Sequence, residues 1–253
     1  YTPEMEYLED HLKDYSECIN AISKRMRKNL KDHPLKFARL LSEALQTSKN
    51  RKEFSEIIDN KSTLAMRKAH DFFGWMAKNG SIGACKGAIY RSLNYMQVPI
   101  KNRSGRIHDA ATDFGVHIEH SIPINQIISA LWSRRDLFLE LENPTLVTRT
   151  AHEDFIELSV CTAITRQEQK NCIKPAYAKR HPDFDATGRP KIGFSLKDVR
   201  PFIRYDFTGG LKIFEMINGR EIKPDTWSLQ DHEDLISKID VYHWDRISKC
   251  DFA

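Results

Sequence analysis

The sequence lacks a long hydrophobic run. No apolar stretch of the 253 residues approaches the roughly 18 residues that a membrane-spanning helix needs, and the mean hydropathy is −0.54. Residues 1–5 also lack the basic and then apolar order of a secretory signal. We therefore expect no membrane partner.

Cysteine is sparse and irregularly placed. The five cysteines are Cys18, Cys85, Cys161, Cys172 and Cys250. Their number is odd and none forms a C-x-x-C pair, which argues against a zinc ribbon and against a disulfide framework. This usage is typical of a reducing compartment, so we expect a cytoplasmic protein.

A large excess of charge of one sign is also absent. The chain has 39 Lys and Arg against 35 Asp and Glu, a net charge of +4. This small excess permits a nucleic-acid partner without requiring one. Hydrophobic residues make up 40% of the chain and aromatic residues 10%, which is enough for the core of one large domain or two small ones.

The pattern of apolar residues predicts an α+β fold with three regions. Residues 1–105 read as a helical N-terminal region for DNA contact or dimerisation, ending at the turn-rich segment 101–105. Residues 106–175 form the central region. Residues 176–253 read as β-rich, with strands at 202–206, at 211–216 and beyond Gly219, and with a closing helix capped by Ser228.

The central region carries the most informative pattern. Residues 116–123 alternate as a strand does and end in a turn at Pro123, with Glu119 directly before His120. We expect a helix at 127–141, a short strand at 143–147 and a helix start near 150. Asn143 precedes that second strand, and His152 follows Asn143 by nine residues.

This arrangement resembles the HNH, or ββα-metal, nucleases over about 40 residues. Their motif is an acid-His-x-x-Pro on a first strand, an Asn before a second strand and a His nine residues later on a helix. The resemblance implies a central strand–strand–helix unit that hydrolyses phosphodiester bonds with one divalent metal ion. Such a motif stays a hypothesis until its structural context is seen.

The chemistry of cleavage suggests a role for each residue. A neutral imidazole can take a proton from the attacking water, so we expect His120 to be the general base. Glu119 and His152 are the expected ligands of Mg²⁺ or Mn²⁺. Strand neighbours point to opposite faces, which lets base and metal flank one phosphate. By the resemblance, Asn143 holds the loop that carries His120.

Other residues near this block are candidates for binding. We expect His117 on the same strand face as His120, as a substrate contact or an extra ligand. Arg106 and Arg149 are candidates for binding the substrate phosphate. A structural role is the expectation for six other histidines: His11, His33, His70, His108, His232 and His243.

Two other interpretations stay open. Pro182-Asp183 with Glu221 and Lys223 matches the Pro-Asp and Glu-x-Lys elements of another nuclease class. A non-catalytic nucleic-acid-binding module is the second alternative. A zinc peptidase is excluded, because its two metal-binding histidines need a different spacing.

The sequence therefore predicts a DNA endonuclease. The core motif leaves some 200 residues for other tasks, which by analogy favours a sequence-specific enzyme of the restriction or phage type. A homodimer is expected if the product is a double-strand break, since that product needs two active sites.

Overall fold

A computed structural model describes residues 3–28, 35–75, 87–99, 115–191 and 193–245 of the chain. The turn-rich boundary at 101–105 and Arg106 lie outside the described residues. Within the described part, no helix combines the length and the apolar character that crossing a bilayer requires.

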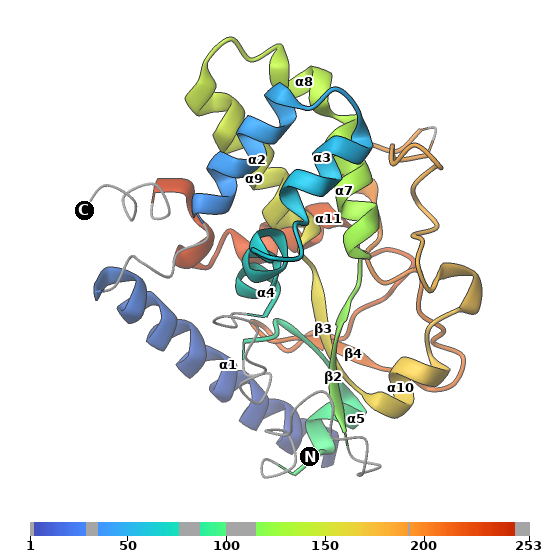
Figure 1. The fold of residues 1–253 in the computed structure, drawn as a ribbon. Helices are drawn as coiled ribbons and strands as arrows, with labels where there is room; N and C mark the ends of the chain where they lie inside the picture. Colours follow the sequence, from blue (N-terminus) through green and yellow to red (C-terminus); the bar gives the residue numbers. More distant parts are fainter. Residues whose placement is uncertain (1–2, 29–34, 76–86, 100–114, 192, 246–253) are drawn as a thin grey trace.

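The described part of residues 1–75 is mainly helical, as predicted, whereas residues 90–92 of the predicted helical region form a strand. The helices are α1 (Pro3–Lys28), α2 (Leu35–Thr47), α3 (Arg51–Ile58) and α4 (Ala65–Trp75). The apolar stripe of α2 is buried at Phe37, Leu41 and Leu45, which is the helical spacing expected for a face turned to the core. Figure 1 shows α2 and α3 gathered with later helices at one end of the molecule, and α1 along one side.

One sheet of four strands lies at the other end (Figure 1). Its strands are β1 (Tyr90–Ser92), β2 (Val116–His120), β3 (Cys161–Thr165) and β4 (Ile213–Glu215), in the order β2-β3-β1-β4. β3 runs antiparallel to β2 and parallel to β1, and β4 runs antiparallel to β1. The sheet takes strands from all three predicted regions, so they share one sheet and one hydrophobic core.

The central region confirms the first strand and corrects the second. β2 covers the predicted strand, and α7 (Ile124–Ser133) with α8 (Arg135–Leu139) occupies the predicted helix. The strand predicted at 143–147 is wrong, because α9 (Pro144–Leu158) begins there. The Asn143 side chain accepts hydrogen bonds from two backbone N–H groups of the first turn, and Pro144 suits the first helical position.

A strand–strand–helix order is nevertheless present, made from other residues. β2 pairs along its whole length with β3, and α10 (Arg166–Asn171) follows β3 directly, with a capping box between Thr165 and Glu168. Three helices separate the two strands in sequence. The pairing places His120 opposite Cys161 and Glu119 opposite Thr162.

The C-terminal region is less β-rich than predicted. β4 confirms the centre of the strand at 211–216, and Glu221 adds a single bridge to it. The strand at 202–206 is wrong: this segment is a series of turns, and its buried Arg204 side chain donates hydrogen bonds to β2 and to the segment after α10. α5 (Leu93–Gln97) follows β1, and α11 (Leu229–Ile236) is the predicted closing helix, capped by Ser228.

Candidate functional site

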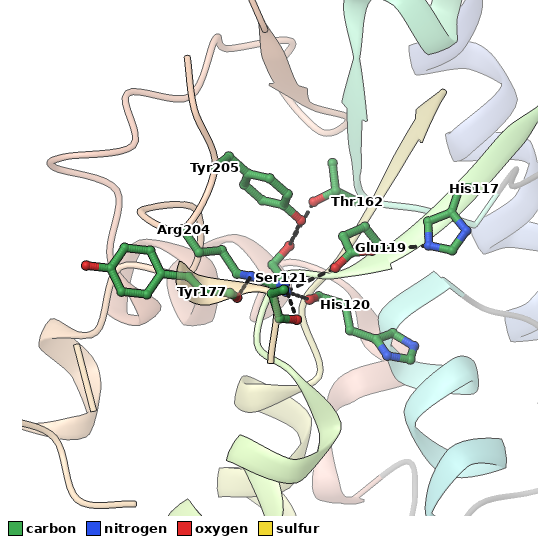
Figure 2. Close-up of polar contacts among 9 residues, drawn as sticks. His117, Glu119, His120, Ser121, Thr162, Tyr177, Arg204 and Tyr205 are labelled. Carbon is green, nitrogen blue, oxygen red and sulfur yellow. Dashed lines mark hydrogen bonds and ion pairs between the residues drawn. The ribbon is translucent and has the colours of Figure 1, made fainter. Parts of the chain in front are cut away.

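Glu119 and His120 end β2 and extend in different directions (Figure 2). The Glu119 carboxylate is buried and both of its oxygens are engaged. Its Oε1 accepts a hydrogen bond from Nη1 of Arg204 at 3.0 Å, and its Oε2 lies 3.1 Å from Nε2 of His117. His117 therefore shares a strand face with Glu119, and the expectation that it shares one with His120 is wrong.

Arg204 is a buried guanidinium that connects β2 to the segment after α10. Its side chain is 2% exposed. It donates to the backbone oxygens of His120 at 2.7 Å, Tyr177 at 3.1 Å and Ala178 at 3.0 Å, besides Glu119. A buried charge is tolerated when it is paired and fully hydrogen-bonded, so this network fixes the end of β2.

The His120 side chain faces α4 and the start of β3. Its ring centroid lies 4.4 Å from that of His70, with an angle of 61° between the planes. Nδ1 of His70 lies 3.7 Å from Sγ of Cys161. One ligand atom from each of these three residues lies within 4.8 Å of the other two. We call His70, His120 and Cys161 the HHC cluster.

Local structure explains how three residues distant in sequence meet. Cys161 is the residue of β3 that pairs with His120, and cross-strand partners place their side chains on the same face. His70 comes from α4, where Gly74 follows one turn later. A Cβ atom at Gly74 would lie 2.5 Å from Sγ of Cys161 and 2.9 Å from the Ser159 backbone oxygen, so only glycine lets α4 approach β3 this closely.

Both imidazoles of the cluster are neutral at pH 7. Burial lowers the pKa of His120 to about 4; Glu119 raises it in part, and Arg67 is among the cations that lower it further. Burial also holds the pKa of His70 well below its usual range, and the positive charges of Arg67 and of His120 when it is protonated lower it further. Metal ions bind the deprotonated forms of histidine and cysteine, so the burial of these rings favours ligation.

Two histidines and a thiol are a suitable ligand set for a transition metal ion. In a tetrahedral zinc site, bond lengths near 2.3 Å to sulfur and 2.0 Å to nitrogen separate the two ligand atoms by roughly 3.5 Å. The 3.7 Å between Cys161 and His70 is close to that separation. Thiolate and imidazole select Zn²⁺ or similar ions over Mg²⁺, which prefers oxygen ligands.

The residues predicted to bind magnesium do not fit a shared site. Glu119 already engages Arg204 and His117 with its two oxygens. His152 is buried on α9, where its ring contacts those of Phe73, Phe155 and Trp244. Phe73 belongs to α4, so His152 lies on the side of β2 that His120 faces, and Glu119 points the other way.

The other predicted residues lie apart from the cluster. Asn143 caps α9 with its side-chain oxygen rather than holding the loop after β2. Arg149 is half-exposed on α9 and pairs with Glu153, four residues later, at 2.8 Å. In the Pro-Asp and Glu-x-Lys alternative, the Asp183 carboxylate is bound by three N–H groups of Arg200, while Glu221 and Lys223 are exposed beyond β4.

Sequence reasoning missed two of the three cluster residues. From the sequence, a structural role is the expectation for His70, and Cys161 is one of five scattered thiols. No local motif marks either residue, because His70 and Cys161 are 91 positions apart. Their only shared signal in the sequence is that each lies in an apolar segment.

Comparisons of the chain with protein-family models, with curated proteins and with solved structures found no match.

Proposed function

We propose that this protein is a metal-dependent phosphodiester hydrolase that acts on nucleic acid, with DNA as the expected substrate. The observation that carries the proposal is the HHC cluster at the end of β2. The strand that supplies His120 is the one whose acid-His-x-x-Pro pattern resembles the HNH nucleases. The metal ligands in this proposal differ from those that the sequence predicted.

The chemistry follows from the number of protein ligands. Zinc held by three protein ligands leaves a position for water, and bound zinc lowers the pKa of that water to about 7. The oxygen of the attacking water forms a bond to phosphorus and the P–O3′ bond breaks. The water proton leaves to solvent and the departing 3′ oxygen takes up a proton, which yields a 5′-phosphate and a 3′-hydroxyl.

His120 acts as a ligand in this scheme rather than as a free base. An imidazole has one nitrogen lone pair in its neutral form, so a ring that binds the ion cannot also accept the proton of the water. The two roles of His120 exclude each other, and variants can separate them.

A cation beside the cluster supports an anionic substrate. Arg67 lies one turn before His70 on α4, and its charge is close enough to lower the pKa of both imidazoles. Its side chain pairs with Asp59 at 3.1 Å and is 48% exposed, so a phosphate that approaches from solvent can still reach it. Among the cluster residues, His120 is the one that is partly exposed, and the substrate would approach there.

The test is cleavage of a supercoiled plasmid with Zn²⁺, Mn²⁺, Mg²⁺ or EDTA. We expect Cys161→Ser and His70→Ala to lower the rate at least 100-fold, and His152→Phe and Glu119→Gln to keep most of it. The opposite pattern, in which Glu119 and His152 are essential with Mg²⁺ while Cys161→Ser is active, would establish the site that the sequence predicted. Linear product without nicked product would indicate a pair of chains acting together.

A metal centre without catalysis is the second candidate function. Its supporting observation is that His70 and Cys161 are each 0% exposed, as is typical of metal sites that stabilise a fold. In that case zinc binds stoichiometrically, removal of zinc lowers the melting temperature, and no metal supports cleavage.

A further inference from the structure

A second candidate binding site is a basic pocket beside residues 177 and 178, whose backbone oxygens accept hydrogen bonds from Arg204. Its volume is about 520 Å³. Four cations line it: Arg51, Lys179, Arg180 and Lys191. One carboxylate, that of Asp185, is also among the lining residues, and its Oδ1 accepts hydrogen bonds from Thr187 and Arg189.

The four cations come from two separate parts of the chain that the fold holds together. Arg51 is the first residue of α3, and the other three belong to the loop 179–191. Gly188 brings this loop against α7, because its φ is +90° and a Cβ atom there would lie 2.4 Å from the Ser129 backbone. Asp183 anchors the base of the loop through its ion pair with Arg200 at 2.7 Å.

The cation from α3 is held in place by neutral groups. Nε of Arg51 donates to Oγ of Ser129 at 2.9 Å, and Nη2 donates to Oδ1 of Asn125 at 2.7 Å. Neither partner carries charge, so the full positive charge of Arg51 remains available to a ligand. None of the four lining cations pairs with a carboxylate of the described residues, which makes the pocket an unbalanced positive surface.

The pocket is connected to the end of β2 through Arg204. Tyr177 lines it, and the Tyr177 and Ala178 backbone oxygens accept the hydrogen bonds of Arg204. The same guanidinium holds the His120 backbone oxygen. Figure 2 shows the Tyr177 ring pointing away from β2 while its carbonyl oxygen faces Arg204, so the ring stays free to contact a base or a sugar.

We propose that this pocket binds the phosphate backbone of a nucleic acid. The inference rests on the proposed function for its substrate class. Its own basis is four cations around one concave surface that have no carboxylate partner among the described residues, at the spacing that the Gly188 contact and the Arg51 hydrogen bonds maintain. Lys and Arg without acidic partners are the groups that displace counterions from a phosphate backbone.

The experiment is fluorescence anisotropy of a labelled 20-base-pair DNA duplex with the full chain in EDTA, at several salt concentrations. The site variant combines Lys179→Ala, Arg180→Ala and Lys191→Ala. The control combines Lys36→Ala, Lys61→Ala and Lys238→Ala, which removes the same charge from exposed positions elsewhere.

We expect the site variant to lose at least tenfold in affinity at low salt. Its slope of log affinity against log salt should fall by about 3, one for each lost phosphate contact. The control should change the affinity less than twofold. Equal losses of affinity in both variants would show that the overall charge, and not the pocket, determines binding, and would overturn the proposal.

Two further arms identify the ligand and separate this inference from the proposed function. If inorganic phosphate competes with the labelled duplex as strongly as unlabelled duplex does, the pocket binds small anions and the proposal is overturned. Preference for phosphatidylserine vesicles over the duplex would overturn it as well. Binding that depends on the pocket without any cleavage would contradict only the proposed function, whereas cleavage together with duplex binding that the site variant leaves unchanged would contradict only the inference.

Discussion

Two adjacent residues, Glu119 and His120, end the same strand in opposite surroundings. On the Glu119 side, the buried acid meets the buried guanidinium of Arg204, and their charges offset each other. On the His120 side, two imidazoles and a thiol face one another without a carboxylate in the cluster. The balanced ion pair on the Glu119 side therefore has a structural role. The converging nitrogen and sulfur lone pairs on the His120 side can bind a cation.

The largest effect is expected on the balanced side. Arg204→Met leaves Glu119 buried without its cation and removes the donor to three backbone oxygens. Loss of one partner of a buried ion pair costs about 3–5 kcal/mol of the free energy of unfolding. Urea denaturation measures this loss. Arg149→Met is the control: its ion pair with Glu153 is half-exposed, and such pairs contribute less than about 1 kcal/mol. Similar losses of unfolding free energy in the two variants would contradict the special role of the buried Arg204.

A smaller effect is expected where α4 meets β3. Gly74→Ala places a methyl group against Cys161 Sγ and the Ser159 backbone, and overpacking of this kind costs about 1–3 kcal/mol. Because the methyl group displaces Cys161, zinc affinity should fall as well. Gly209→Ala is the matched control, since its added Cβ would meet no atom within 4 Å. An unchanged zinc affinity for Gly74→Ala would argue against a site at this contact.

The smallest effect is expected at Asn143. Asn143→Ala removes the acceptor for the first turn of α9, and loss of such a cap costs about 1 kcal/mol. Plasmid cleavage should stay within a few fold of the wild type, because Asn143 supports α9 and not the end of β2. A loss of cleavage greater than 100-fold, at unchanged stability, would return Asn143 to the active site.

Local patterns in the sequence predicted the local elements well. The alternation that ends at His120 predicts β2, and Ser228 three residues before Asp231 predicts the start of α11. Alternation also places Glu119 and His120 on opposite faces, as Figure 2 shows. These features depend on spacings of a few residues, which a single sequence displays directly.

Features that depend on contacts between residues far apart in the chain could not be predicted from the sequence. The partner of β2 is a strand 41 positions later, at Cys161, and not the segment after Asn143. The turn at 202–206 forms because Arg204 reaches inward to β2, a contact that no local pattern encodes. His70 joins the cluster for the same reason, since only the packing of α4 on β3 brings it to Cys161.

Titration of the metal-free protein with Co²⁺ tests the central claim most directly, because the visible spectrum of Co²⁺ reports both geometry and sulfur ligation. We predict one equivalent bound, absorption bands typical of tetrahedral cobalt, and a thiolate-to-cobalt charge-transfer band that Cys161→Ser removes. Addition of Zn²⁺ should abolish all of these bands. A spectrum of six-coordinate cobalt that is identical in the wild type and in Cys161→Ser would contradict a metal centre at His70, His120 and Cys161.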